Sequence, residues 1–379
     1  MIKVLHTSDW QLGMTRAFLS PESQARFAEA RLEAIRTIAR IAHEEMCDCV
    51  VVAGDTFESN AVDRKTIARA LDALAEFGET PVVILPGNHD CLDASSVYSS
   101  KAWNEGCTPN VVVLHDCQPI EIQGAGGSLE IIGAPWDNKR PLSDLVSEAC
   151  QGLDEGDKIR IVLGHGSIDT LSPDPNDPAL ISLSLMEQAI RARSVHYFAL
   201  GDRHSTTEVG GTGRIWFSGT PLQTDYDEIE PNKALVIELD QDRITVEPRL
   251  VGTWSFLRKR IDLNSGEDVV ALEQWLSELP AKTTTIVRLG LVGTLSLTEK
   301  AKLDAILEDA ESRLAALTIS ERRSDLVVAP DTIDINALNL SGFARLAFED
   351  LQEQATSADS AAQTAQDALG LMFRLSGRY

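Results

Sequence analysis

Short apolar runs rich in β-branched residues alternate with longer segments of helical period at the start of this 379-residue chain. Residues 2–6, 49–53 and 81–85 read as strands, whereas 20–41 and 63–77 carry apolar side chains at helical spacing. Alternation of this kind is typical of strands and helices that pack together around a largely buried sheet. The pattern therefore predicts an α/β fold class.

The sequence pattern changes twice further along the chain. Strand-like runs dominate up to about residue 252, and a compact α+β pattern follows. The last part reads as two helices separated by an Ala- and Ser-rich stretch at 355–362. We therefore expect three parts: residues 1–252, 253–333 and 334–379.

The chain is strongly acidic, with 34 Lys and Arg against 58 Asp and Glu and a net charge of −24. This composition excludes a non-specific nucleic-acid coat, which needs excess basic residues to displace counterions, but it leaves room for a local site. No run of about 18 apolar residues and no signal-peptide pattern occurs, so we expect a cytoplasmic protein without a membrane partner. The six cysteines have no CxxC spacing and are expected to be free thiols.

Residues able to bind metal ions follow the three strands named above and two further expected strands, at 159–163 and 195–200. They are Asp9, Asp55, Asn88 with His89, His165, and Asp202 with His204. Glycine lies beside four of these five sets, where it permits the abrupt turn that leaves a strand. Each residue taken singly also suits a turn or a helix cap. Because the carboxyl ends of strands in an open α/β sheet border the ligand crevice, we expect the whole set to meet at one rim.

The motifs around these residues resemble the signature of the calcineurin-like metallophosphoesterases. The motifs are His6-Thr7-Ser8-Asp9-Trp10, Gly54-Asp55-Thr56-Phe57, Gly87-Asn88-His89-Asp90 and Ser218-Gly219-Thr220-Pro221. Together they are most similar to the SbcD-type DNA-repair nucleases, over about residues 1–252. The resemblance implies an αββα sandwich in that region. It further implies a smaller α+β domain that caps the site and helps place DNA, followed by a helical tail that engages an SbcC-like ATPase subunit.

The resemblance also implies a site for two divalent metal ions. Asp9, Gln11, Asp55 and His204 would hold one ion. Asp55 would also bind the second ion, together with Asn88, His165 and Asp202. His89 would lie outside the ligands and stabilise charge or protonate the leaving oxygen, with Asp90 orienting its ring. A carboxylate that bridges two cations suits in-line phosphoryl displacement, in which the cations activate water and stabilise both the attacking and the leaving oxygen.

Two positions depart from the family's pattern, which has histidine where this chain has Gln11 and Asp202. Both replacements present oxygen donors, and oxygen-rich sites favour hard ions. We therefore expect Mn²⁺, with Mg²⁺ as the alternative. The added carboxylate also lowers the charge of the centre by one, which predicts a weaker Lewis acid.

The tail carries two sets of apolar residues that suit helix packing. They are Leu340, Phe343, Ala347 and Leu351, and then Leu369, Leu371, Met372 and Leu375. Such stripes pack on their own domain or on a partner, and the resemblance favours the ATPase partner. Two residues near the motifs also keep two interpretations each: His6 supports the site or lies satisfied in the core, and Arg203 contacts phosphate or pairs with a carboxylate.

We expect a metal-dependent DNA nuclease that hydrolyses phosphodiesters in DNA repair together with an SbcC-like ATPase. Two alternatives remain open. The acidic composition favours a phosphatase or phosphodiesterase of the same fold that acts on a small molecule. The replacements at Gln11 and Asp202 favour a weakly catalytic regulatory subunit. A homodimer is also compatible with the sequence.

Overall fold

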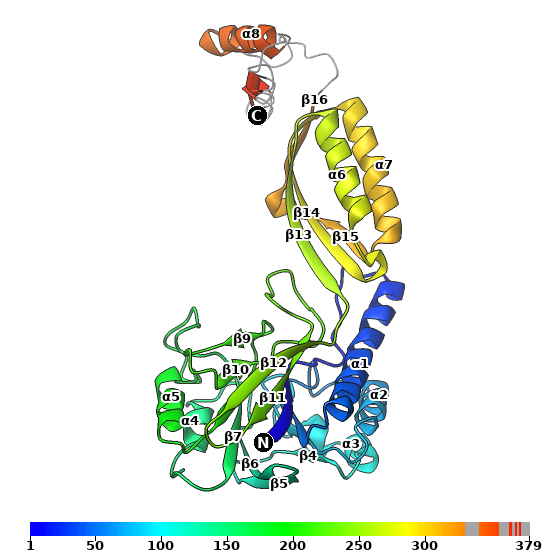
Figure 1. Cartoon of the computed structure of the whole chain (residues 1–379). Helices are drawn as coiled ribbons and strands as arrows, with labels where there is room; N and C mark the ends of the chain where they lie inside the picture. The colour runs from blue at the N-terminus through cyan, green and yellow to red at the C-terminus, as the bar shows by residue number, and fades with distance from the viewer. Residues whose placement is uncertain (330–340, 356–363, 366–367, 370, 373–379) are drawn as a thin grey trace. The chain divides into compact units, whose positions relative to one another are not determined.

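The computed structural model describes residues 1–329, 341–355, 364–365, 368–369 and 371–372 (Figure 1). The chain divides into two compact units. The first unit comprises Met1–Ala17 and Gln24–Trp254, and the second comprises Phe18–Ser23 and Ser255–Tyr379. Leu340, Leu375 and most of the Ala- and Ser-rich stretch lie outside the described residues.

The first unit contains two six-stranded sheets. One sheet has the order β12-β11-β1-β2-β3-β4. Its strands are β1 (Ile2–Thr7), β2 (Cys49–Ala53), β3 (Val82–Leu85), β4 (Val111–Val113), β11 (Lys233–Leu239) and β12 (Ile244–Leu250). Strands β1 to β4 run parallel, whereas β11 and β12 are antiparallel additions at one edge.

The other sheet has the order β5-β6-β7-β8-β10-β9. Its strands are β5 (Ile120–Gly124), β6 (Gly127–Gly133), β7 (Ile159–His165), β8 (Tyr197–Gly201), β9 (Thr207–Glu208) and β10 (Ile215–Phe217). The four inner strands are parallel, and β5 and β9 close the edges in antiparallel pairing. Buried side chains from both sheets form one core between them, including Val4, Val51, Ile131 and Ile161.

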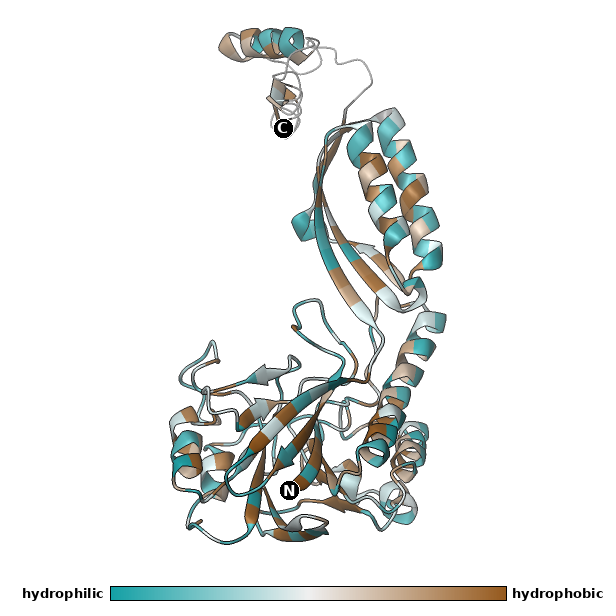
Figure 2. Cartoon of the chain, viewed as in Figure 1, coloured by the Kyte–Doolittle hydropathy of each residue, from teal (hydrophilic) through white to brown (hydrophobic). Residues whose placement is uncertain are grey.

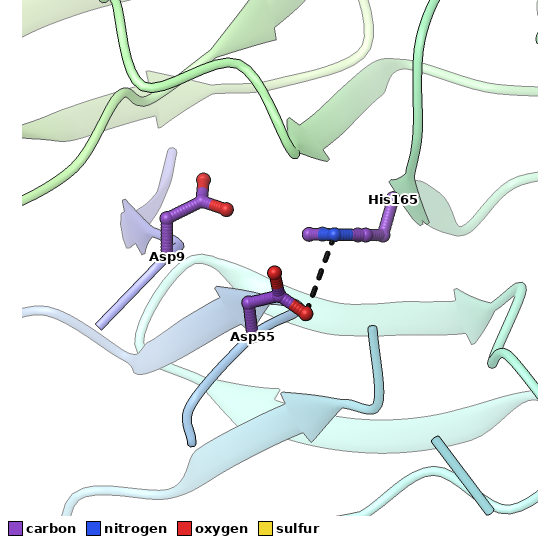
Figure 3. A group of neighbouring side chains, drawn as sticks. All are labelled: Asp9, Asp55 and His165. Carbon is purple, nitrogen blue, oxygen red and sulfur yellow. Dashed lines mark ion pairs between the residues drawn. The ribbon is translucent and has the colours of Figure 1, made fainter. Parts of the chain in front are cut away.

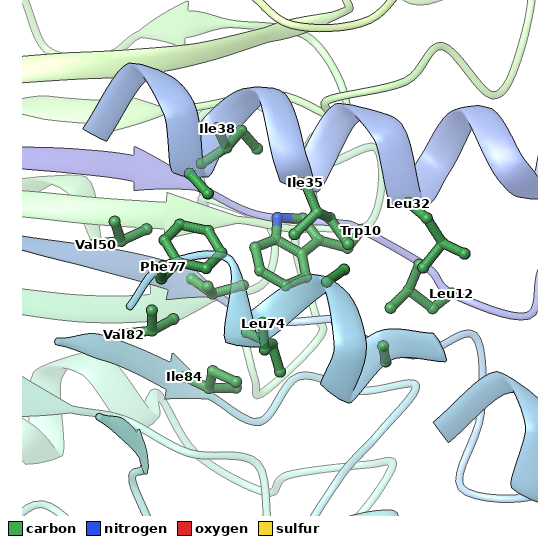
Figure 4. Close-up of a cluster of buried hydrophobic side chains, with 14 of the residues drawn as sticks. Trp10, Leu12, Leu32, Ile35, Ile38, Val50, Leu74, Phe77, Val82 and Ile84 are labelled. Atoms are coloured by element: carbon green, nitrogen blue, oxygen red, sulfur yellow. The ribbon is translucent and has the colours of Figure 1, made fainter. Parts of the chain in front are cut away.

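Helices cover the outer faces of the two sheets. They are α1 (Pro21–Glu44), α2 (Arg64–Ala75) and α3 (Lys101–Gly106) on the first sheet, and α4 (Leu145–Ala149) and α5 (Leu183–Arg191) on the second. Figure 4 shows Trp10, Ile35 and Phe77 packed together between the helices and the first sheet. The layers are therefore helix, sheet, sheet and helix, which confirms the expected αββα sandwich.

The helix starts follow from local chemistry. Helix α1 begins at Pro21, whose missing N–H group and fixed φ suit the first helical position. Helix α2 begins after Asp63, whose carboxylate accepts a hydrogen bond from the Thr66 N–H group at 2.7 Å. Short 3₁₀ turns lie at Val97–Ser99, Lys282–Thr284 and Glu321–Arg323.

The second unit is built on a four-stranded, all-parallel sheet. Its strands are β13 (Ser255–Leu263), β14 (Thr285–Ser296), β15 (Ala316–Ile319) and β16 (Asp325–Ala329), and each of the others pairs with β14. Helices α6 (Gly266–Glu278) and α7 (Leu297–Arg313) pack their apolar side chains on one face of this sheet. Figure 2 shows hydrophilic residues on the other sides of these helices. Helix α8 (Phe343–Ala355) follows.

Within the described part of the chain, each helix is too short or too polar to cross a lipid bilayer.

Candidate metal centre

The residues expected at the metals lie at or just beyond the carboxyl ends of five parallel strands. Asp9 and Gln11 follow β1, Asp55 follows β2, and Asn88 follows β3. The second sheet contributes His165 at the end of β7, and Asp202 and His204 beyond β8. Both sheets of the sandwich therefore supply side chains to this rim.

Three of these residues form a compact buried group (Figure 3). One ligand atom each from Asp9, Asp55 and His165 lies within 4.8 Å of the others, and all three residues are buried. Oδ1 of Asp55 lies 3.5 Å from Nε2 of His165. Two buried carboxylates beside one imidazole form a candidate metal site, because buried charges require a partner or a cation.

Four of the expected ligands have left-handed backbone conformations. The φ angles are 54° for Asp9, 44° for Gln11, 55° for Asp55 and 92° for Asp202. Such a conformation costs a residue with a side chain about 1–3 kcal/mol and persists where the surroundings enforce it. Here the N–H group of Asp9 donates to the carbonyl of Gly54 at 3.0 Å, and that of Gln11 donates to the carbonyl of Asp55 at 2.9 Å. The first two loops of the rim therefore hold each other in this strained shape.

Two glycines let the loops approach the site closely. A Cβ atom at Gly54, where φ is +94°, would lie 2.0 Å from Nδ1 of His165. A Cβ atom at Gly87 would lie 2.3 Å from Oδ1 of Asp55. Because no side chain fits at these distances, space requires glycine at both positions, and the positive φ of Gly54 adds a backbone requirement there.

His165 has a defined orientation. Its Nδ1 donates to the carbonyl of Ala53 at 2.9 Å, so Nε2 faces Oδ1 of Asn88 at 2.9 Å and Oδ1 of Asp202 at 4.0 Å. Burial lowers the pKa of His165, but the carboxylate of Asp55 and those further away raise it well above its ordinary value. The oxygen atoms around Nε2 of His165 therefore stabilise a positive charge placed between them.

The two buried carboxylates differ in their electrostatics. Burial raises the pKa of Asp9 to about 6, although His204 and His165 oppose the shift. Burial also acts to raise the pKa of Asp55, but the charge and hydrogen bond of His165, together with His89, lower it overall. Ser8 and the backbone of Asp202 add hydrogen bonds to the Asp9 carboxylate, at 2.6 Å and 3.2 Å.

Gln11 carries the clearest sign of a missing partner. Only 4% of this residue is exposed, and its Oε1 atom has no hydrogen-bond partner among the described residues. A buried polar atom left without a partner costs about 1–3 kcal/mol. Its Nε2 atom lies 3.1 Å from Nε2 of His204, which in turn lies 3.9 Å from Oδ1 of Asp9. A hard cation among these donors would satisfy the free oxygen, so the donor set fits a divalent metal.

The structure corrects the role expected for Asp90. Its buried carboxylate accepts hydrogen bonds from Tyr98 Oη at 2.6 Å, Gly87 N at 2.8 Å and Phe57 N at 3.1 Å, so it holds the loop after β3. Burial raises its pKa to about 6. His89 is oriented instead by the carbonyl of Glu58, to which its Nδ1 donates at 2.7 Å.

His89 itself lies beside the site. Its backbone N–H group donates to Oδ1 of Asp55 at 3.0 Å, and its Nε2 atom lies 3.9 Å from Oδ2 of the same carboxylate. The side chain is 38% exposed, unlike the buried group behind it. The ring can therefore reach both the Asp55 carboxylate and solvent.

His6 and Arg203 each kept two interpretations from the sequence, and their contacts differ. His6 is buried and bonded to Tyr197 Oη at 3.0 Å and to the carbonyl of Leu200 at 3.2 Å, so it is a satisfied core histidine. Nε of Arg203 donates to Oγ1 of Thr207 at 3.1 Å, which is a hydroxyl rather than a carboxylate.

Several supporting residues were not expected from the sequence. Glu58 orients His89, and Thr224 and Glu228 contact Nδ1 of His204. Ser218 and Thr220 belong to a quoted motif, and they now have a structural reason: their hydroxyls contact Ser8 Oγ and the carbonyl of Asp9. For Glu58 and Glu228 the sequence offers no local signal, because each contacts a histidine more than 20 positions away.

Comparison with known families defines the class. Residues 2–205, more than half of the chain, match the family model described as calcineurin-like phosphoesterase. The chain therefore belongs to the calcineurin-like phosphoesterases.

Its relatives are more specific. It is 28% identical over 236 residues to the SbcD component of the SbcCD nuclease of Bacillus subtilis, a match that covers 59% of this chain and 55% of that protein. It is 23% identical over 263 residues to the corresponding SbcCD component from Escherichia coli K12, covering 61% and 63%. The chain thus spans less than two thirds of the length of these relatives. A solved dimetal phosphatase from Danio rerio aligns with a TM-score of 0.41 at 13% identity, over 65% of this chain and 96% of that one.

Proposed function

We propose that this protein is a metal-dependent phosphodiester hydrolase that cleaves DNA. The observation that carries the proposal is the buried donor set at the rim, in which Gln11 Oε1 lacks a partner among the described residues and Asp9, Asp55 and His165 lie together. A buried group of carboxylates, amides and imidazoles is costly without a cation, which supports a divalent metal as its occupant.

The proposed ligands divide between two ions around Asp55. Asp9, Gln11, Asp55 and His204 would hold one ion, and Asp55, Asn88, His165 and Asp202 the other. Most of these side chains offer oxygen donors, which favours Mn²⁺, with Mg²⁺ as the alternative. When bound, such ions lower the pKa of a water molecule and stabilise charge on a phosphoryl group.

His89 is the proposed catalytic side chain. The Glu58 carbonyl fixes the proton on Nδ1 of the neutral ring, so Nε2 is directed to the Asp55 side of the site. From this position the protonated ring would stabilise developing charge or donate a proton to the leaving oxygen. Asp90 is a positioning residue in this proposal, because it holds the loop that carries His89.

The choice of DNA and of a partner is supported by the relatives, which are named as parts of the SbcCD nuclease. We propose that the chain works in the cytoplasm, in DNA repair, with an SbcC-like ATPase. Residues 253–333 would cap the site and help place DNA, and residues 334–379 would bind the ATPase.

A substrate comparison tests this proposal. The purified full chain with Mn²⁺ is offered single-stranded DNA, bis(p-nitrophenyl) phosphate and p-nitrophenyl phosphate, with the Asp55→Ala variant as control. We expect cleavage of DNA and of the diester, slow or no release from the monoester, and loss of all activity in the variant.

A small-molecule phosphatase is the second candidate, and the net charge of −24 favours it because a polyanion is repelled. Hydrolysis of the monoester at a higher rate than DNA would support that candidate. Absence of metal binding in the full chain would support a regulatory subunit.

A further inference from the structure

A hydrogen-bonded network lies behind His204, on the side opposite the candidate ligands. Nδ1 of His204 lies 2.8 Å from Thr224 Oγ1 and 2.9 Å from Glu228 Oε1. Thr224 donates twice to Glu228: its N–H group to Oε2 at 2.9 Å, and its hydroxyl to Oε1. The side chain of Glu228 is only 6% exposed, so these contacts are sheltered from water.

The network assigns the position of the imidazole proton. An ionised carboxylate only accepts hydrogen bonds, so Nδ1 of His204 must donate to Glu228. On the other side of the ring, Nε2 of His204 lies 3.1 Å from the side-chain amide of Gln11. The contact with Glu228 therefore places the proton of the neutral ring on Nδ1 and leaves a lone pair on Nε2, which faces Gln11.

We propose that Glu228 is a positioning residue that keeps this lone pair available to a divalent cation beside Gln11 and Asp9. The inference rests on the proposed metal-binding function of the site. Carboxylates that accept from the far nitrogen of a ligand histidine fix its tautomer and orientation in this way.

The loop that carries Glu228 is anchored independently of the histidine. The N–H group of Ile229 donates to Ser205 Oγ at 2.9 Å. Further along, Oδ1 of Asn232 accepts from Gln223 N at 2.7 Å, and its Nδ2 donates to the carbonyl of Trp254 at 2.8 Å. Glu228 is thus held in place before any cation binds.

Thr224 gives the proposal a specific consequence. In Glu228→Ala the Thr224 hydroxyl has lost its acceptor and is free to turn and donate to Nδ1 of His204. The ring proton would then reside on Nε2, where it blocks the lone pair that faces Gln11. Adding Thr224→Val removes this competing donor, so the double variant should regain part of what the single variant loses.

The test combines Mn²⁺ affinity with the tautomer of His204 in the full chain. Calorimetry measures Mn²⁺ binding. Histidine ¹⁵N shifts in the metal-free protein, recorded at a pH high enough for the ring to be neutral, report which nitrogen carries the proton, with His204→Gln identifying the signal. We expect wild-type protein to show the Nδ1–H tautomer. Glu228→Ala should shift the ring towards Nε2–H and weaken Mn²⁺ binding by about 10- to 100-fold. Glu228→Ala/Thr224→Val should bind more tightly than Glu228→Ala.

Glu230→Ala is the matched control, because Glu230 lies in the same loop, has a 63% exposed side chain and pairs with Lys233 at the surface. It should bind Mn²⁺ like wild type. An Nε2–H tautomer in wild-type protein would overturn the inference even if Glu228→Ala does not fold, and so would unchanged affinity in a folded Glu228→Ala. Wild-type protein that binds no Mn²⁺ would instead overturn the proposed function, while the tautomer still tests the role of Glu228.

Discussion

His89 is the partly exposed histidine beside the buried carboxylates, and its two ring nitrogens have different surroundings. Nδ1 is held by the Glu58 carbonyl at 2.7 Å, and Nε2 faces Asp55 at 3.9 Å. Its side chain is not among the proposed ligands. A group in this position can act on a substrate without holding the metal.

The first prediction follows from that separation. His89→Ala should lower turnover by about 10² to 10⁴ because a positioned acid or charge stabiliser is lost. Mn²⁺ content should stay at the wild-type value. Steady-state hydrolysis and metal analysis of the same preparation measure both. Parallel loss of metal and turnover would make His89 a ligand and contradict the assigned role.

A second prediction at this scale concerns His6 and stability. Burial lowers its pKa to about 3, against about 6.5 in the unfolded chain. Between these values the unfolded state binds more protons, so this contribution to stability is complete above pH 6.5 and is lost as the pH falls towards 3. The loss is about 1.4 kcal/mol per pH unit.

Replacing His6 should remove this dependence of the free energy of unfolding on pH. The free energy of unfolding of wild type, measured with denaturant at pH 7.5 and pH 5, should fall by about 2 kcal/mol more than that of His6→Gln. His115→Gln, at an exposed position, is the control and should behave like wild type. Equal pH dependence in wild type and His6→Gln would mean that burial does not lower the pKa of His6.

At the scale of elements, the ends of the strands bring the site together, and Gly54, directly after β2, leaves no room for a side chain. Gly54→Ala would place its Cβ atom 2.0 Å from Nδ1 of His165, besides imposing an unfavourable φ. This contact would break the hydrogen bond from Nδ1 of His165 to the carbonyl of Ala53. We expect a loss of Mn²⁺ binding and destabilisation greater than the roughly 1 kcal/mol that positive φ alone costs alanine.

Gly152→Ala separates the two causes. Gly152 also has a positive φ, +75°, but no atom lies within 4 Å of a Cβ placed there. Thermal unfolding should show only the small backbone cost, with Mn²⁺ binding unchanged. If Gly54→Ala is no worse than Gly152→Ala, the close approach to His165 does not exist in solution.

A strand with a continuous apolar core was predictable from the sequence, whereas several short elements were not. Strand β2 is buried throughout and reads plainly as a strand. Strands β5 and β9 and helix α3 are short. The leucine and alanine residues of β15 continue the helical spacing of α7, so the spacing alone predicts a helix over 297–317, which the structure ends at Arg313. The spacing of apolar residues does not tell where a helix ends when no glycine or proline follows.

Some features of the site were likewise predictable from the sequence, and others were not. The motifs indicated which side chains gather at the rim, because strand ends converge in this fold class. They did not reveal that Asp90 turns towards Tyr98 and the loop backbone, since a carboxylate beside a histidine in sequence need not contact it. Glu228 was equally hidden, because its contact with His204 is made only by the folded loop.

At the scale of the whole molecule, we propose that the first unit carries the chemistry and that the tail binds a partner. Helix α8 buries Phe348 but leaves Phe343 86% exposed and Leu346 65% exposed. Exposed large apolar residues at a spacing of three on one helix suit a protein partner.

Deleting residues 336–379 tests this separation. The truncated chain should lose co-purification with an SbcC-like ATPase and keep Mn²⁺-dependent cleavage of single-stranded DNA. Co-expression with affinity capture, followed by a nuclease assay, measures both. The account is wrong on this point if the truncated chain aggregates or if the ATPase is still captured.

The central claim is that Asp55 lies between two metal ions. Diffraction from crystals grown with Mn²⁺, collected at the manganese edge, tests it most directly. We predict two anomalous peaks on either side of the Asp55 carboxylate, one near Gln11 and His204 and the other near Asn88 and His165, and none in Asp55→Ala. A single peak away from Asp55, or no peak at saturating Mn²⁺, would contradict the account.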